Sequence, residues 1–208
     1  TTPVHVVDKA TKLQTIYDRI DLVDTRFEVL KRDARLAALR AQLALRPVVD
    51  AGAEAAAESN LQRELQAIDA DREFLRRCNQ GVESMQEADQ LRVRMIGTQR
   101  QWRNVEGVHT AFLTAEEMEN LTIRAGTLTQ AERDTINYHI VATIKMLETL
   151  PWPRHLKNVP EYAGGHHERM DGKGYPKGLS REQMSVQARI MGIADIFEAL
   201  TASDRPYK

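Results

Sequence analysis

The chain has 208 residues, of which 42% are apolar, 5% aromatic and 28% charged. This composition is typical of long solvated helices, so we expect an extended helical part beside a compact part. The formal net charge of −1 argues against binding of a nucleic acid polymer through a general basic field. No window approaches the roughly 18 apolar residues of a membrane span, so no membrane contact is expected. The single cysteine, Cys78, excludes an intrachain disulfide and suits a reducing compartment.

Heptad-like spacing predicts an antiparallel helical hairpin within residues 12–96. The first helix is expected from Thr11 to Arg46, and the segment 47–52 interrupts it with a proline and a glycine. A second helix is expected from about Ala53, although Arg72 and Asn79 fall where its apolar stripe needs hydrophobic residues. We interpret the hairpin as a projecting arm or dimerisation element without chemistry of its own.

Capping boxes predict where the helices of the compact part begin. Thr114 with Glu117 opens a short helix to about Leu121, Thr129 with Glu132 opens a longer one, and Ser180 with Gln183 is a third box. The longer helix ends before Pro151, and its expected apolar face consists of Ile136, Ile140, Ile144 and Leu147. His139 lies beside this face. By position alone, a packed core histidine is the simpler interpretation of His139 than a metal ligand.

The segment from Gly164 to Pro176 holds the densest group of metal-capable residues, in the order Gly-Gly-His-His-Glu-Arg-Met-Asp-Gly-Lys-Gly-Tyr-Pro. His166 and His167 supply neutral nitrogen ligands that suit iron, manganese or zinc. We predict a helix from His155 to Glu168 that carries them. Consecutive helical side chains point about 100° apart, so the pair is expected to reach two neighbouring ions, or an ion and a phosphate, rather than chelate one ion. The alternative is an ordinary glycine-rich helix end with surface histidines.

The rest of this segment is expected to form a ligand-shaping loop. Glu168 and Asp171 add hard oxygen atoms, and Gly172 and Gly174 permit backbone conformations that other residues avoid. Tyr175 is an amphipathic anchor, and Pro176 restricts the exit of the loop.

A last helix is expected from about Ser185, with an inward face of Val186, Ile190, Ile193, Ala194 and Phe197. Asp195 lies inside this apolar run. A carboxylate on a buried face needs a partner, and a metal ion is the obvious candidate.

The order His-His-Glu, two residues, Asp-Gly, one residue, Gly-Tyr-Pro resembles the HD-GYP family of bacterial metal-dependent phosphodiesterases, which hydrolyse the second messenger cyclic di-GMP. The resemblance extends over roughly residues 121–208. It implies an all-α fold: an incomplete HD-domain-like helical bundle with the hairpin as an insertion. The implied domains are an N-terminal edge (1–11), the helical insertion (12–96) and the domain core (97–208).

The resemblance also implies a set of site residues. The segment 126–132 is similar to the turn before the family's ligand-bearing helix, which makes His139 an implied ligand, and Asp195 lies in a context like that of the family's aspartate ligand. The implied metal ligands are His139, His166, His167 and Asp195. The implied substrate-binding residues are Arg205, Lys208, Gly172, Gly174, Tyr175 and Pro176. For the end of the chain around Arg205, a solvated, frayed terminus is the alternative.

For the complete protein, the resemblance implies two or three divalent metal ions, iron or manganese. These would polarise the phosphate and activate a water for in-line attack on phosphorus. The implied substrate is cyclic di-GMP and the implied product is linear pGpG, with GMP as a further product. A diguanylate cyclase or sensor domain is a further expected partner, and the apolar seam of the hairpin predicts pairing with a second copy of the chain. The expected location is the cytoplasm, or the cytoplasmic part of a membrane receptor.

One departure from the family pattern is the absence of any His-Asp dipeptide from the 208 residues. Either the pair lies ahead of Thr1 in a longer protein, or the site is degenerate. We expect truncation, because the other implied ligands remain and both ends look cut, and we expect residues 1–208 to be inactive alone. The alternative function is a noncatalytic signalling module that binds a partner protein or cyclic di-GMP. A different HD-type nucleotide phosphohydrolase is less favoured because it would not need Gly-Tyr-Pro.

Overall fold

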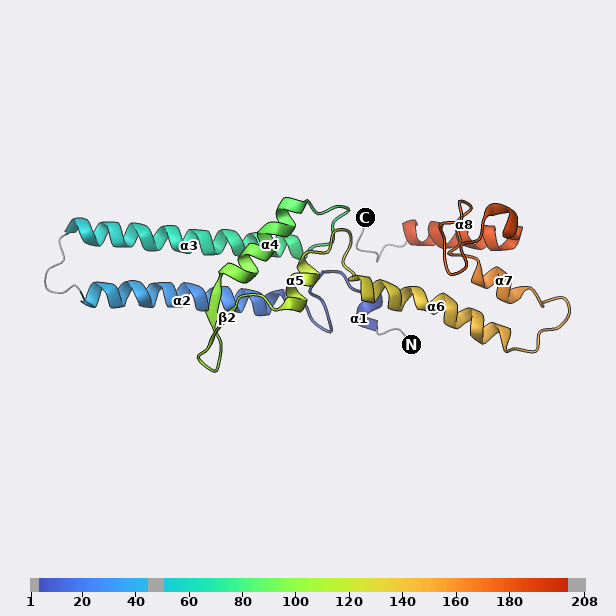
Figure 1. Ribbon diagram of the computed structural model, residues 1–208, viewed down its shortest axis with the longest axis horizontal. Coiled ribbons are helices and arrows are strands. Elements are labelled where there is room, and N and C mark those ends of the chain that lie inside the picture. The colour runs from blue at the N-terminus through green and yellow to red at the C-terminus, as the bar shows by residue number, and fades with distance from the viewer. Residues whose placement is uncertain (1–3, 45–50, 202–208) are drawn as a thin grey trace. The chain divides into compact units, whose positions relative to one another are not determined.

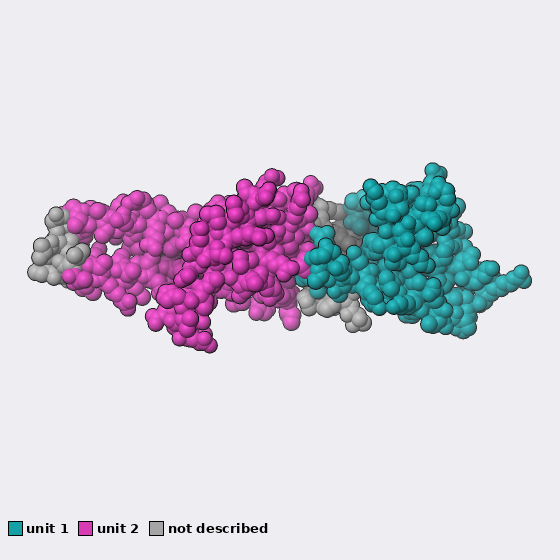
Figure 2. Space-filling model, viewed as in Figure 1, with its two compact units in different colours: residues 1–7, 130–208 teal, residues 8–129 magenta. Residues whose placement is uncertain are grey.

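The computed structural model describes residues 4–44 and 51–201. The chain divides into two compact units (Figure 2), one formed by residues 8–129 and the other by residues 1–7 together with 130–208. Each unit is described separately. The described residues are mostly helical, as predicted, and the strands are limited to one two-stranded hairpin. None of the described helices combines the length and the apolar character that a membrane span requires.

The unit of residues 8–129 is a helical hairpin with smaller elements at its base. Its two long helices run side by side (Figure 1). In chain order the elements are α2 (Ile20–Ala44), α3 (Ala51–Asn79), α4 (Glu87–Gln99), β1 (Gln101–Arg103), β2 (His109–Ala111) and α5 (Ala115–Leu121). The strands pair antiparallel with Trp102 opposite Thr110, and sequence reasoning did not predict them.

The first long helix begins at Ile20, so the predicted start at Thr11 is wrong. The residues before it are held by contacts distant in sequence. The amides of Lys12 and Leu13 donate to the backbone carbonyl and the side-chain oxygen of Asn79, at 2.8 Å each. Asp18 accepts from the amide of Ile20 at 3.0 Å, which satisfies a donor at the helix start. These long-range bonds prevail over the local heptad pattern.

The two polar positions in the predicted stripe of α3 have structural functions. Arg72 forms ion pairs with Asp24 and Glu28 of α2 at 3.2 and 3.1 Å. Asn79 is 1% exposed and donates to the carboxylate of Asp18 at 2.9 Å. Buried polar groups with partners do not break a core. The predicted second helix is therefore present despite the two interruptions.

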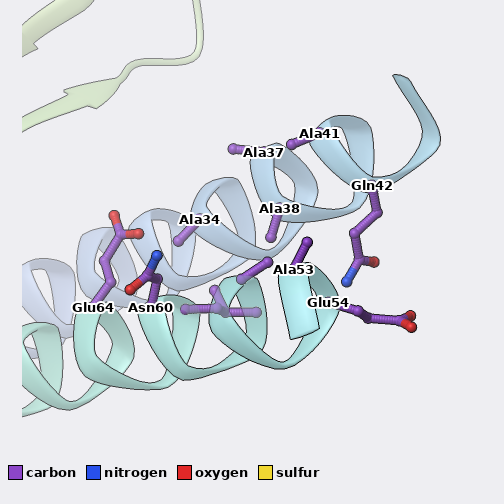
Figure 3. Close-up of a pocket in the computed structure, with 11 residues that line it drawn as sticks. Ala34, Ala37, Ala38, Ala41, Gln42, Ala53, Glu54, Asn60 and Glu64 are labelled. Carbon is purple, nitrogen blue, oxygen red and sulfur yellow. The ribbon is translucent and has the colours of Figure 1, made fainter. Parts of the chain in front are cut away.

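Large apolar side chains fill the hairpin only near its base, where Phe27, Ile68 and Leu75 are at most 2% exposed. Toward the connection of α2 and α3 the seam consists of alanines. These leave a gap of about 320 Å³ between the helices (Figure 3), lined among others by Ala34, Ala38, Ala41, Ala53 and Ala57. Alanine buries little area, so the outer half of the hairpin is held together weakly.

The predicted capping box at the start of α5 is confirmed. The Thr114 hydroxyl accepts from the Glu117 amide, and the Glu117 carboxylate accepts from the Thr114 amide. The same carboxylate receives a two-pronged ion pair from Arg26 of α2, with N–O distances of 2.7 and 2.8 Å. Burial raises the pKa of Glu117, but the hydrogen bonds from Arg26 and Thr114 outweigh it, so the pKa lies below its ordinary value.

The other unit holds α1 (Val4–Val7), α6 (Gln130–Glu148), α7 (Val159–Gly164), a 3₁₀ turn (Arg181–Gln183) and α8 (Val186–Thr201). The predicted capping box of Ser180 with Gln183 is present, on the 3₁₀ turn. The predicted helix from His155 to Glu168 is shorter than expected, because α7 ends at Gly164 and the histidine pair lies in the following turn.

Glycines let α7 approach both neighbouring helices. A Cβ atom on Gly164 would lie 2.8 Å from Ile144 of α6, and one on Gly165 would lie 2.7 Å from Ala188 of α8. Such distances are shorter than any ordinary carbon contact. The Gly-Gly pair therefore places the next two residues, His166 and His167, between α6 and α8.

The predicted inward face of α8 is exposed. Ile190, Ile193 and Phe197 are 59, 62 and 67% exposed, and Ala188 is the buried residue of this helix. The amphipathic pattern correctly identified an apolar face. Within its unit, however, α8 packs on α7 through Ala188, and that contact uses a different side of the helix.

The compact units do not coincide with the predicted domains of residues 1–11, 12–96 and 97–208. Residues 97–129 belong to the unit of the hairpin, because α4 and α5 pack against its base. The compact units are defined by contacts within the structure, whereas the predicted domains are defined by resemblance to a family. The predicted domain limits therefore stay a prediction.

Candidate metal centre

Three histidines from two parts of the sequence meet in the unit of residues 130–208. His139 lies on α6, and His166 and His167 follow α7. One ring nitrogen from each lies within 4.8 Å of the others. The ring centroids of His139 and His167 are 5.0 Å apart, and those of His166 and His167 are 4.1 Å apart. The structure therefore brings together the three imidazoles that the sequence singled out.

Backbone carbonyls orient two of these rings. Nδ1 of His139 lies 2.5 Å from the carbonyl oxygen of Ile136, and Nδ1 of His166 lies 2.6 Å from that of Ala163. A carbonyl oxygen only accepts, so Nδ1 carries the hydrogen of each neutral ring and Nε2 keeps its lone pair. This is the arrangement in which a histidine presents Nε2 to a metal while its other nitrogen is anchored.

His167 lies between His139 and Asp195. Its Nε2 is 3.2 Å from Nε2 of His139, and its Nδ1 is 3.8 Å from a carboxylate oxygen of Asp195. Burial lowers the pKa of His167, and so do the imidazoles of His166 and His139, while Asp195 opposes the shift. The balance favours the neutral ring, which is the form that ligates metals.

Asp195 borders the histidine cluster but is not buried. Its side chain is 45% exposed, so the expectation of a carboxylate on a buried face is wrong. Gly192, one helical turn earlier, lets α8 approach the cluster, since a Cβ there would lie 3.0 Å from the carbonyl oxygen of His166. Together the four residues line a cavity of about 380 Å³ that Val7, Ile136 and Ala199 complete.

The geometry suits a divalent cation. If the Nδ1 hydrogen of His167 points toward Asp195, its Nε2 lone pair faces that of His139 across 3.2 Å. Two lone pairs at this distance repel each other unless a proton or a metal ion is shared between them. Imidazole nitrogens with one carboxylate are donors that iron, manganese and zinc accept. The residues present therefore fit a metal site, and the metal's identity and number stay predictions.

Tyr175 supports His167. Its ring stacks on the imidazole with centroids 4.9 Å apart and an angle of 17°, and its amide donates to the carbonyl oxygen of His167 at 3.2 Å. Burial raises the pKa of the Tyr175 hydroxyl, and Asp195 adds to the shift. The sequence predicted Tyr175 as a substrate-binding residue, and the structure places it against a candidate ligand.

The two other acidic residues of the motif stabilise the loop. Glu168 is 7% exposed and accepts from the amides of Lys177 and Leu179 at 2.7 and 2.8 Å. Asp171 accepts from the amide of Lys173 and from Arg169. Their oxygens are thus engaged by donors of the loop. Sequence reasoning saw them as sources of hard oxygen, and no local signal distinguishes the two roles.

The remaining predicted substrate residues in the described chain shape the same loop. Gly172 has a φ of +74°, which favours glycine. At Gly174 a Cβ would lie 2.2 Å from the amide nitrogen of Arg169 and 2.4 Å from Cα of Glu168. Pro176 follows a cis peptide bond. The predicted phosphate contacts, Arg205 and Lys208, lie outside the described residues.

Comparison with known proteins matches residues 113–208 to the HD domain family. A 3'3'-cGAMP-specific phosphodiesterase of Vibrio cholerae is 39% identical over 85 residues, which is 41% of this chain and 18% of the relative. A cyclic di-GMP phosphodiesterase of Thermotoga maritima is 34% identical over 90 residues, 43% of this chain and 24% of the relative. A cyclic di-GMP phosphodiesterase response regulator of Xanthomonas campestris is 36% identical over 90 residues, 43% of this chain and 23% of the relative. The chain thus spans less than a quarter of each relative. No solved structure matches.

Proposed function

We propose that this chain, whose C-terminal part is an HD-GYP-type domain, contributes the metal centre of a phosphodiesterase that hydrolyses cyclic di-GMP. The products would be linear pGpG and then GMP. One of the relatives is named for 3'3'-cGAMP, which differs from cyclic di-GMP in one base. This related dinucleotide is therefore the alternative substrate to test.

The convergence of three imidazoles on one cavity carries this proposal. His139 precedes the adjacent pair His166 and His167 by 27 residues, yet ring nitrogens of all three lie within 4.8 Å of one another. Asp195 adds a carboxylate at the edge of the same cavity. Surface histidines without a function have no reason to meet in this way, nor for two of them to have Nδ1 anchored by a backbone carbonyl.

The residues of this chain would hold and orient the reacting groups. His139, His166, His167 and Asp195 would bind two or three divalent ions, iron or manganese, which supply Lewis-acid charge beside the phosphodiester. Tyr175 keeps the His167 ring in place by stacking. Arg205 offers a two-pronged contact and Lys208 a point charge for the phosphates. The loop with Gly172, Gly174, Tyr175 and Pro176 would shape the pocket for the guanine dinucleotide.

The test is metal analysis and hydrolysis by the complete protein, compared with a His166→Ala/His167→Ala double variant. The matched control is His155→Ala, an exposed histidine of the same unit outside the cluster. We expect the double variant to lose bound metal and to lose hydrolysis of cyclic di-GMP by a factor of at least about 100, with the control unchanged. Unchanged metal content in the double variant would refute the site. If the complete protein hydrolysed 3'3'-cGAMP faster than cyclic di-GMP, the proposed substrate would change and the proposed metal site would stand.

We further propose that residues 1–208 alone hydrolyse little or no cyclic dinucleotide. The support is that the described candidate site holds three imidazoles and one half-exposed carboxylate, and that the sequence has no His-Asp pair. Strong hydrolysis by these residues alone would contradict this proposal.

The missing His-Asp pair also favours a second candidate function, a noncatalytic module that binds a partner protein or cyclic di-GMP. A diguanylate cyclase or a sensor domain is the proposed partner class. A complete protein that binds cyclic di-GMP without hydrolysing it, whatever metal is supplied, would support this alternative.

The proposed location is the cytoplasm, free or as part of a membrane receptor, because the single cysteine suits a reducing compartment.

A further inference from the structure

The outer face of α2 carries an apolar stripe that has no partner within the hairpin unit. Leu22, Val29, Leu36 and Leu43 recur at intervals of seven residues, and Leu39 joins them. The four leucines are 45 to 62% exposed. We call this set the α2 stripe. A seven-residue apolar repeat is typical of a helix that packs along a second helix, so the repeat itself indicates a helical partner.

The partner of the α2 stripe is not α3. The residues of α2 that are buried in the hairpin near its base are Val23, Asp24 and Phe27, and farther out Ala34, Ala38 and Ala41 line the seam with α3. At about 100° per residue, the stripe lies on the opposite side of the helix. The outer half of α2 therefore has its alanines toward α3 and its leucines outward. Packing within the hairpin alone would favour the reverse placement.

The outer face of α3 shows what the solvated side of this hairpin otherwise looks like. It presents exposed polar residues, among them Glu58, Gln62, Gln66 and Glu73. Of the α3 side chains that the structure describes, none of the large hydrophobic ones is exposed. If the outer face of α2 only faced solvent, it would be expected to carry polar residues like the outer face of α3. Its exposed leucines therefore need a separate explanation.

We propose that the α2 stripe is a self-association surface, on which α2 of a second copy of this chain packs antiparallel. The stripe from Leu22 to Leu43 extends for about 32 Å at 1.5 Å per residue. This length accommodates three heptads, which suits a reversible dimer better than an obligate one. A two-fold axis near the middle of the stripe gives an isologous contact, in which the same residues serve both partners.

Flanking charges favour the antiparallel direction. In antiparallel pairing, Glu28 of one copy lies opposite Arg35 of the other, and the symmetry repeats this attractive pair. Asp33 then lies near its own copy at the two-fold axis, and Arg40 lies opposite Arg26, whose charge is already paired with Glu117 of its own copy. In parallel pairing, Glu28 would face Asp33 and Arg35 would face Arg40, and each of these repulsive pairs would occur twice, against one attractive pair of Asp21 with Arg26. Charges at such flanking positions set the orientation of paired helices.

The first test is sedimentation equilibrium of the 208-residue chain and of a Leu36→Glu/Leu43→Glu variant. Both leucines are exposed, so the variant is expected to keep the parent's helical circular dichroism. We expect a dimer for the parent and a dissociation constant raised at least about tenfold for the variant. The matched control is Ala55→Glu/Ala67→Glu, which puts two equal charges on exposed positions of α3. It should dimerise like the parent.

The second test fixes the direction by disulfide cross-linking. An Asp21→Cys chain mixed with a Gln42→Cys chain should give mainly the mixed cross-link, because antiparallel pairing brings position 21 of one copy beside position 42 of the other. The native Cys78 is buried and burial raises its thiol pKa, so it contributes little background.

Three outcomes would overturn the proposal. They are a parent chain that stays monomeric at about 100 µM, a leucine variant that dimerises like the parent, and cross-links formed mainly between like positions. Because Arg32 lies among the leucines and Arg35 and Arg40 flank them, a fourth outcome is binding of the monomer to vesicles of anionic phosphatidylserine. Vesicle binding that the leucine variant abolishes would assign the stripe to a lipid surface instead.

Discussion

Replacing Glu168 by alanine is expected to destabilise the loop after the histidine pair without removing a metal ligand. The Glu168 carboxylate is buried and receives two amide hydrogens, from Lys177 at 2.7 Å and from Leu179 at 2.8 Å. Both bonds connect the residue next to His167 with the far side of the loop. Loss of these two hydrogen bonds would make the loop that carries Tyr175 more mobile. The Tyr175 ring would then stack less firmly on His167.

The magnitude follows from the two hydrogen bonds. A hydrogen bond to a charged acceptor contributes about 1.5 to 3 kcal/mol, and water entering the space left by the side chain would restore part of it. We therefore expect Glu168→Ala to lower the free energy of unfolding by about 3 kcal/mol. Glu168→Gln keeps one amide oxygen as an acceptor, so its cost should be about half as large.

The two tryptophans allow the measurement to be made on the right unit. Trp102 lies in the hairpin unit and Trp152 in the unit of the metal centre, so urea unfolding followed by fluorescence in a Trp102→Phe background reports on the latter. Metal content of the folded protein is measured in parallel. The reasoning would be refuted if Glu168→Gln lost one metal ion per chain while its free energy of unfolding changed by less than about 0.5 kcal/mol.

Three further predictions concern the same loop and the base of the hairpin. Gly174→Ala would place a Cβ 2.4 Å from Cα of Glu168, so we expect a loss of about 3 kcal/mol or more in urea unfolding and reduced metal binding. Tyr175→Phe keeps the ring that stacks on His167 and should retain metal affinity, whereas Tyr175→Ala should weaken it about tenfold in a metal titration. Because the pKa of Glu117 is below its ordinary value when folded, its stabilising contribution is present above the unfolded pKa and is lost as the pH falls through the folded one. Glu117→Gln should therefore lower stability at pH 7 by about 3 kcal/mol and flatten the acid side of the stability curve, as measured by circular dichroism.

Local patterns in the sequence determined those features whose cause lies within a few residues. The capping boxes at Thr114 and Ser180 were predicted at the residues where the structure has them, because both partners of a box are three positions apart. The hairpin was predicted because apolar periodicity sets the face of each helix. The motif from Gly164 to Pro176 also identified the candidate ligands and the loop beside them.

The tertiary structure decided what depends on residues far apart in the chain. The start of α2 at Ile20 depends on bonds between residues 12–13 and Asn79, which no local window contains. Glu168 serves the loop because it accepts from the amides of Lys177 and Leu179. Asp195 lies on the same side of α8 as Ala188 and Gly192, at the edge of the histidine cavity, where it stays 45% exposed. The sequence by itself determined which side chains can hold a metal. Folding decided which of them meet, because close contacts at two glycines bring α6, α7 and α8 together around the three imidazoles.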